Sequence, residues 1–185
     1  MEEMWNDREV RKQWMKSRET GGQVRFLKDT DKGLYVSKIE LKTIAEIILS
    51  KHLSVQIIKP ATLCAVVEIM SGRFINGVGS RIGLTGIDYP TAEWLHKELG
   101  YKTYRVDTIE DLRKPFVSMY FGAAYMVWLS EYEGRERSPQ FIVKAYLSGP
   151  KNVNLEETCP SWLKFEEELS YYEGIKRESE SCAVM

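Results

Sequence analysis

The stretch Thr62–Asp88, TLCAVVEIMSGRFINGVGSRIGLTGID, decides how the rest of the chain is interpreted. Its first half is an almost entirely apolar run that carries a single carboxylate, Glu68. Its second half is rich in glycine, which disfavours regular helix and favours turns or a small hairpin. We therefore expect a buried helix with one acid, followed by a turn-forming segment. This order can hold one ionisable group at the mouth of a cleft.

The composition is that of one globular domain without a nucleic-acid-binding surface. The chain has 185 residues, of which 43% are apolar and 29% are charged, and its formal net charge is −1. This length is enough for one domain with a substantial core. The basic residues are scattered along the sequence, so we expect no nucleic-acid partner.

Neither the N-terminus nor the cysteines indicate secretion, and we expect a cytoplasmic location. Residues 1–14 are charged throughout, and no later run of about 18 apolar residues occurs. The three cysteines, Cys64, Cys159 and Cys182, are far apart and lack the spacing of a zinc site. We expect no disulfide framework, no metal and no cofactor.

Capping signals and hydrophobic spacing predict a mainly helical chain of the α+β class. Ser37-Lys38-Ile39-Glu40 has the capping-box pattern that opens a helix. Pro60 stands where the first turn of a helix tolerates a missing N–H. We expect helices over residues 4–18, 38–53, 61–70, 89–99, 116–133, 139–146 and from 160 onward, with short strands at 24–27 and 34–36.

Three separated motifs follow one another in the middle of the chain. Glu68 ends the apolar run, Gly83-Leu84-Thr85-Gly86-Ile87 begins fifteen positions later, and Ala145-Tyr146 is followed by Gly149-Pro150. This succession resembles the bacterial soluble lytic transglycosylases, which belong to the lysozyme-like superfamily together with goose-type lysozymes. The resemblance spans roughly residues 60–152. It implies a lysozyme-like helical domain with a small glycine-rich loop or hairpin.

The resemblance also implies roles for individual residues. In that family the first motif is a glutamate followed by serine, the second is G-L-M-Q-[IVL] and the third is A-Y-N. Glu68 then matches the catalytic general acid and base, and Tyr146 matches a tyrosine that lies near the glutamate and holds it. The substrate-binding positions that match the second motif are Gly83, Leu84, Gly86 and Ile87.

The activity that the resemblance implies is cleavage of a β-1,4-linked N-acetylated glycan, such as peptidoglycan or chitin. One glutamate serves as acid and then as base, and the N-acetyl group of the substrate assists, which yields a 1,6-anhydro sugar. The apolar neighbours of Glu68 would desolvate its carboxyl group and favour the neutral form, which can donate a proton. Asp88 stands where goose-type lysozymes have an aspartate, and we favour helix N-capping over electrostatic catalysis as its role.

Three polar groups of the family's site are missing from this chain. Ile69 replaces the serine after the glutamate, Gly86 replaces the glutamine of the second motif, and Leu147 replaces the asparagine of the third. Each lost hydrogen bond typically costs about 1–3 kcal/mol. The alternative is therefore a catalytically inactive lysozyme-like module that binds a glycan or a protein and is lipid-anchored through Cys182. Without the other motifs, Glu68 would be read as the polar position of an amphipathic helix and Tyr146 as an ordinary core tyrosine.

The last four residues, Cys182-Ala183-Val184-Met185, have the C-a-a-X form of a farnesylation signal. We expect Cys182 to carry the lipid and to attach the protein peripherally to a membrane. A single lipid gives only reversible binding, and the preceding residues are not polybasic. We divide the chain into a charged arm and loop (residues 1–36), the lysozyme-like domain (37–175) and a flexible tail (176–185).

Overall fold

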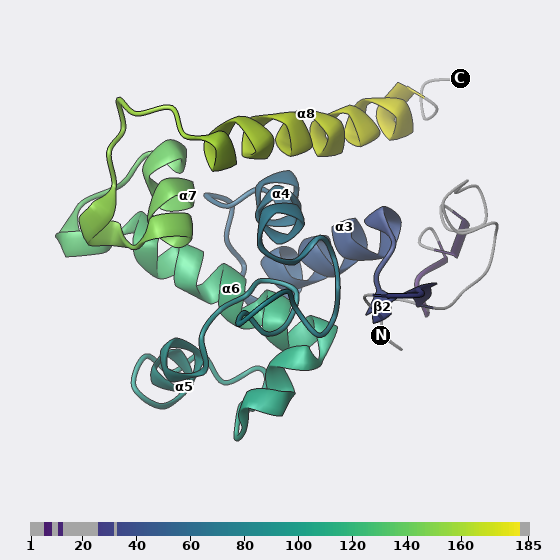
Figure 1. Ribbon diagram of the computed structural model, residues 1–185, viewed down its shortest axis with the longest axis horizontal. Helices are drawn as coiled ribbons and strands as arrows, with labels where there is room; N and C mark the ends of the chain where they lie inside the picture. Colours follow the sequence, from purple (N-terminus) through teal and green to yellow (C-terminus); the bar gives the residue numbers. More distant parts are fainter. Residues whose placement is uncertain (1–5, 9–10, 13–25, 32, 182–185) are drawn as a thin grey trace.

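The structure is a computed structural model that describes residues 6–8, 11–12, 26–31 and 33–181. In chain order its elements are β1 (Leu27–Asp29), β2 (Gly33–Tyr35), α3 (Lys38–Ile47), the π-helical turn η1 (Ile48–His52), α4 (Pro60–Ser71), α5 (Tyr89–Lys97), the 3₁₀ turn η2 (Ile109–Arg113), α6 (Pro115–Ser130), the 3₁₀ turn η3 (Tyr132–Gly134), α7 (Pro139–Ser148), the 3₁₀ turn η4 (Pro150–Asn152) and α8 (Pro160–Ser181). Figure 1 shows the path of the chain through these elements.

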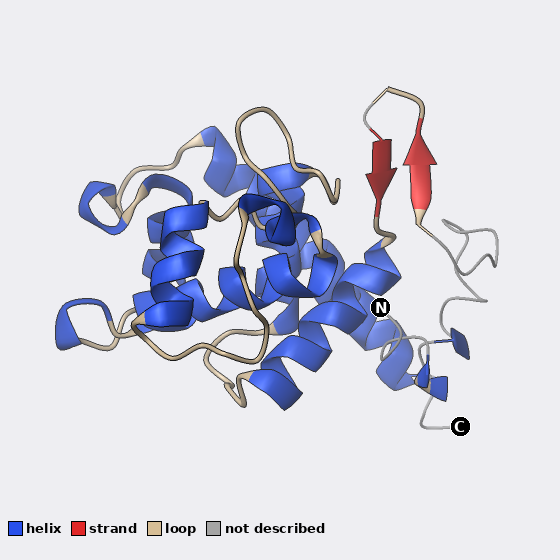
Figure 2. Ribbon diagram, turned by 90° about the horizontal axis from the view of Figure 1, so that it is seen from below, coloured by secondary structure: helices blue, strands red, loops and turns tan. Residues whose placement is uncertain are grey.

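The helices pack around α6, which runs diagonally through the middle of the helical body (Figure 1). α8 crosses above α4, and α4 packs in turn against α3 (Figure 1). Strands β1 and β2 form one antiparallel hairpin, in which Leu27 pairs with Tyr35 and Asp29 pairs with Gly33. This hairpin stands at the edge of the helical body (Figure 2). The expected class, mainly helical with a small β component, is confirmed.

The helix starts follow the capping signals of the sequence. The N–H of Glu40 donates to Ser37 Oγ at 3.1 Å, and the N–H of Ser37 donates to Glu40 Oε2 at 2.8 Å, which completes the capping box of α3. α4 begins at Pro60. Asp88 is the N-cap residue of α5, but its side chain makes no capping hydrogen bond. The predicted capping position of Asp88 is therefore correct, whereas the predicted contact is not formed.

The core lies where α6 meets the glycine-rich segment that follows α4. Phe121, Ala123 and Ala124 of α6 are fully buried. A Cβ atom on Gly122 would lie 2.5 Å from the side chain of Thr85, so only glycine allows this close approach. The second sequence motif is thus packed directly against the central helix.

Some predicted boundaries differ from the structure. The hairpin is formed by residues 27–35, and the glycine-rich segment after Gly72 is a loop that touches the hairpin through one bridge between Tyr35 and Phe74. α8 extends to Ser181, whereas we predicted a flexible tail from residue 176. Residues 176–181 are mostly Glu, Lys and Arg, which are good helix formers, or Ser. The predicted helix over residues 4–18 and the strand at 24–27 fall largely outside the described residues.

Among the described residues, no helix is both long enough and apolar enough to cross a membrane.

The contact between Gly122 and Thr85 gives a testable consequence for stability. We expect Gly122→Ala to lower the free energy of unfolding by about 1–3 kcal/mol, because the added methyl group overpacks the core. Urea unfolding of the variant and the wild type measures this difference. Gly174→Ala in α8 is the matched control, since a Cβ atom there meets nothing within 4 Å. Equal losses of stability in the two variants would contradict the proposed close packing.

Candidate functional site

The carboxylate of Glu68 lies in the last turn of α4 and is surrounded by donors from three other parts of the chain. The hydroxyl of Tyr172 in α8 donates to Glu68 Oε1 at 2.6 Å. Arg73 Nε lies 3.0 Å from the same oxygen, and Lys38 Nζ of α3 lies 3.8 Å from it. The Glu68 side chain is only 9% exposed. Its first role in this structure is therefore to join helices.

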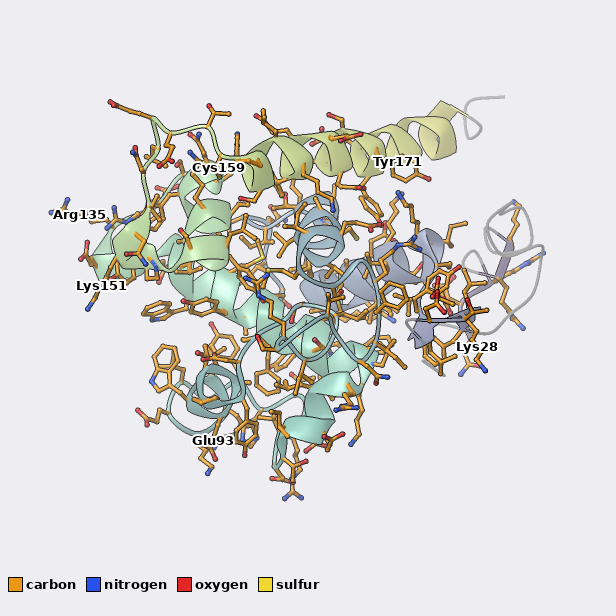
Figure 3. All side chains as sticks on the ribbon, viewed as in Figure 1. Lys28, Glu93, Arg135, Lys151, Cys159 and Tyr171 are labelled. Atoms are coloured by element: carbon orange, nitrogen blue, oxygen red, sulfur yellow. The ribbon has the colours of Figure 1, made fainter. Side chains whose placement is uncertain are left out.

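The partners of Glu68 are themselves held in place. Lys38 Nζ also lies 3.6 Å from Glu168 Oε2 and 3.7 Å from the ring centroid of Tyr171, both in α8. Arg73 Nη1 donates to the backbone carbonyl of Val36 at 2.9 Å. Figure 3 labels Tyr171 on α8, above the end of the molecule that carries the hairpin. We call Lys38, Glu68, Arg73, Glu168 and Tyr172 the Glu68 cluster.

The donors around Glu68 are one phenol hydroxyl and two cationic side chains. The phenol itself remains a donor, because burial, followed by the neighbouring Cys64 and Glu68, raises the pKa of Tyr172 far above its ordinary value. Burial likewise raises the pKa of the Cys64 thiol. The Glu68 carboxylate therefore already has three partners within the protein.

The second motif, Gly83–Ile87, is part of the core. The N–H of Thr85 donates to Ser118 Oγ at 3.1 Å, and Thr85 Oγ1 donates to the Ser118 carbonyl at 2.9 Å. A Cβ atom on Gly83, which has a φ of +77°, would lie 2.0 Å from the carbonyl oxygen of Leu112. Of the predicted substrate-binding positions, Gly83, Leu84 and Ile87 are buried, and only Gly86 is half-buried. The motif is therefore a structural element whose edge alone reaches the surface.

Tyr146 is attached to the second motif and not to Glu68. Its hydroxyl donates to the backbone carbonyl of Thr85 at 3.0 Å, and the residue is 8% exposed. Burial raises the pKa of this phenol well above its ordinary value. Our expectation that Tyr146 holds Glu68 is wrong, because the hydroxyl hydrogen of Tyr146 is donated to the carbonyl of Thr85. Tyr172, which is 104 positions from Glu68, has that role instead.

Two side chains at the end of α4 face the second motif: Met70 lies against Gly86, and Ser71 Oγ donates to the Leu84 carbonyl at 2.7 Å. A Cβ atom on Gly86 would lie 3.0 Å from Met70 Cε and 3.3 Å from Arg81 Cδ. Residues two positions apart on an α-helix point roughly 200° apart around its axis. Met70 therefore faces the motif on one side of α4, while Glu68 faces α8 on the other. The two-residue spacing of Glu68 and Met70 already indicates that these side chains point in different directions.

Asp88 lies at the surface, close enough to Tyr125 and Tyr146 to affect their pKa values. It is exposed, and after burial its negative charge is among the causes that raise the pKa of Tyr125 and Tyr146. Arg81 is also exposed and has the opposite effect on Tyr146. The two charged residues thus flank the edge of the second motif. Arg73, by contrast, belongs to the Glu68 cluster.

Three surface pockets lie away from both predicted catalytic residues. One of about 520 Å³ adjoins Pro60 and one of about 560 Å³ adjoins Gly134. A third, of about 210 Å³, is lined by Lys144 and Cys159 and lies where the chain passes from α7 to α8 (Figure 3). Neither Glu68 nor Tyr146 lines any of these three pockets.

Comparison with known proteins adds no assignment to this geometry. No model of a known protein family, no curated protein and no solved structure matches the chain. In the described part of the chain, no group of three or more His, Cys, Asp or Glu side chains is placed to hold a metal ion. Cys182, the predicted lipid attachment site, lies outside the described residues.

The hydrogen bond between Tyr172 and Glu68 can be tested directly. We expect Tyr172→Phe to lower the free energy of unfolding by about 1–3 kcal/mol, because the buried carboxylate loses a donor that water cannot replace. Urea unfolding provides the measurement. The neighbouring Tyr171→Phe is the control, with an expected change within about 0.5 kcal/mol, since Tyr171 is exposed. A Tyr172→Phe variant as stable as the control would rule out this role for the phenol.

Proposed function

We propose that the chain is a lysozyme-like module that binds a β-1,4-linked N-acetylated glycan without cleaving it. The observation that carries the proposal is the chemistry of the side chain that faces Gly86, which is the thioether of Met70. A thioether has no proton to donate and is a weak acceptor, so it cannot protonate a glycosidic oxygen. The catalytic step of the resembled enzymes requires such a proton transfer.

The order of residues at the end of α4 supports this interpretation. In the lytic transglycosylases that the chain resembles, a serine follows the catalytic glutamate. In this chain Ile69 follows Glu68, whereas Ser71 follows Met70. Ser71 Oγ donates to the carbonyl of Leu84 in the second motif at 2.7 Å. Met70 is therefore the residue that best corresponds to the catalytic glutamate, in its neighbours along the chain and in the direction of its side chain.

The presence of a glutamate two positions earlier has an explanation that involves no catalysis. Glu68 joins α4 to α3 and α8 through the Glu68 cluster, and its carboxylate already has three partners. A buried carboxylate with its donors removed is strongly unfavourable, so the residue is needed for the packing of α8. Cleavage with Glu68 as acid and base would require α8 to leave this position.

A glycan is the proposed ligand because the order of the three motifs is that of a glycan-cleaving family. The edge of the second motif also carries groups suited to a polyhydroxylated ligand. Arg81 and Asp88 are exposed there, and Tyr125 and Tyr146 are adjacent. Charged and aromatic groups of this kind fix the orientation of a polar ligand that has apolar faces.

Binding and cleavage can be separated with purified protein. We expect the wild type to bind chitin or peptidoglycan oligosaccharides in calorimetric titrations and to release no shortened or 1,6-anhydro product by mass spectrometry. Glu68→Gln should bind the same oligosaccharides and should unfold at lower urea concentration, because Arg73 and Lys38 lose the carboxylate that they share. Glu167→Gln, an exposed position of α8, is the control for stability.

Each result of this experiment has a defined meaning. Anhydro-sugar release by the wild type that is lost in Glu68→Gln would overturn the non-catalytic proposal and assign cleavage to Glu68. Failure of the folded wild type to bind any of the oligosaccharides would overturn the glycan assignment. Binding without product, together with a stability defect confined to Glu68→Gln, is the result that we expect.

We further propose that the C-terminal Cys182 carries a farnesyl group that attaches the module reversibly to a membrane. The C-a-a-X form of residues 182–185 supports this proposal. In eukaryotic cells that express the chain, Cys182→Ser should remove a farnesyl mass and shift the protein from the membrane fraction to the supernatant. Identical fractionation of the two forms, with no lipid on the wild type, would refute it.

A further inference from the structure

Four aromatic side chains of α5, α6 and η3 form a connected surface beside the second motif. Their central ring is Trp128, which lies nearly parallel to Tyr125, with centroids 5.7 Å apart and an interplanar angle of 12°. Trp94 meets Trp128 edge-on at 5.2 Å and 89°, and Tyr132 does so at 5.3 Å and 76°. We call these four residues the aromatic platform. One parallel ring and two perpendicular rings therefore surround Trp128.

The rings of the platform are half-buried, but their polar ends are unused. Within the described part of the chain, no hydrogen-bond partner is found for the indole N–H of Trp94 or Trp128, or for the hydroxyl of Tyr125 or Tyr132. None of these atoms is among the fully buried polar atoms that lack a partner, so all four remain accessible to water. Tyrosine and tryptophan usually satisfy their polar ends when they only fill a core. The platform thus presents apolar ring surface together with free donors.

The platform is continuous with the edge of the second motif. Tyr125 lies 5.6 Å from the ring of Tyr146, whose hydroxyl is bonded to Thr85. After burial, the negative charge of Asp88 contributes to raising the pKa of both tyrosines, and the positive charge of Arg81 lowers the pKa of Tyr146. Figure 3 shows the side chains of this region, with Glu93 marking the outer side of α5. Charged groups and aromatic rings therefore lie close together beside the second motif.

This combination fits a carbohydrate better than a purely apolar ligand. The C–H face of a pyranose ring packs by dispersion on an aromatic ring, while its hydroxyl and acetamide oxygens accept from donors at the rim. Asp88 can accept from sugar hydroxyls, and Arg81 can donate to them. A glycan chain carries polar groups along both edges, and Arg81 and Asp88 can bind them. A membrane surface would instead require a predominantly basic fringe, whereas the charges beside Tyr132 are mixed: Glu131 and Glu133 are acidic, and Arg137 over the Tyr132 ring is paired with Glu133.

We infer that the aromatic platform is the surface on which the N-acetylated glycan of the proposed function binds, with Trp128 as the central stacking residue. This inference rests on the proposed function but goes beyond it, because it places the binding surface on α5 and α6 and not at Glu68. Sugar units stack on Tyr125 and Trp128, and Trp94 and Tyr132 border them. Binding then depends on rings that have no part in the Glu68 cluster.

The test is a titration of the full chain with chitin oligosaccharides, peptidoglycan oligosaccharides and phosphatidylcholine vesicles, each followed by calorimetry and tryptophan fluorescence. Trp128→Ala should weaken binding at least about tenfold, as expected for a central aromatic contact. Trp94→Ala and Tyr132→Ala, at the border, should weaken it several-fold and carry the test if Trp128→Ala does not fold. Trp162→Phe, in α8 beside Phe165, is the control and should change affinity by less than about twofold.

The outcomes separate this inference from the proposed function. Absence of glycan binding by the folded wild type would overturn both. Binding by the wild type that persists unchanged in Trp128→Ala, Trp94→Ala and Tyr132→Ala would overturn the platform and leave the proposed function standing. Binding of phosphatidylcholine vesicles through Trp128 in place of glycan would reassign the surface to a membrane and overturn both proposals.

Discussion

The carboxylate of Glu68 can be buried only because positive charges and a phenol hydroxyl surround it. Its partners come from α3, from the turn after α4 and from α8. Because all three must reach the same carboxylate, they constrain how these segments pack. A carboxylate removed from water without such partners would be very unfavourable. The position of α8 across α4 therefore follows from one ionisable side chain together with the buried rings of Phe165 and Tyr172.

Helix periodicity separates this structural role from any role at the second motif. α4 directs Glu68 toward α8 and Met70 toward Gly86, so one helix contributes to two different environments. The first is charged and only partly exposed to solvent, whereas the second is lined by a thioether and by the aliphatic part of Arg81. Any ligand that lies along the second motif meets the second environment. In this arrangement the Glu68 carboxylate is bonded to Tyr172 of α8 and lies apart from that surface.

Much of the local structure could be predicted from the sequence, and the long-range contacts could not. The capping box of Ser37 and Glu40 and the first-turn proline of α4 act within four residues, so local pattern was enough to place both helices. The bond between Glu68 and Tyr172 spans 104 positions, and nothing near either residue indicates the other. For this reason the sequence predicted Tyr146 as the partner of Glu68, whereas the structure has Tyr172.

The persistence of the second motif does not itself require catalysis. Gly83 is needed because a Cβ atom would collide with the carbonyl of Leu112, and Gly122 is needed because Thr85 packs against it. Tyr146 and Ser118 then satisfy the polar groups of Thr85. These are demands of packing and hydrogen bonding, and they hold whether or not a substrate is cleaved. Packing and hydrogen bonding therefore account for Gly83, Thr85 and Gly122 without reference to any ligand.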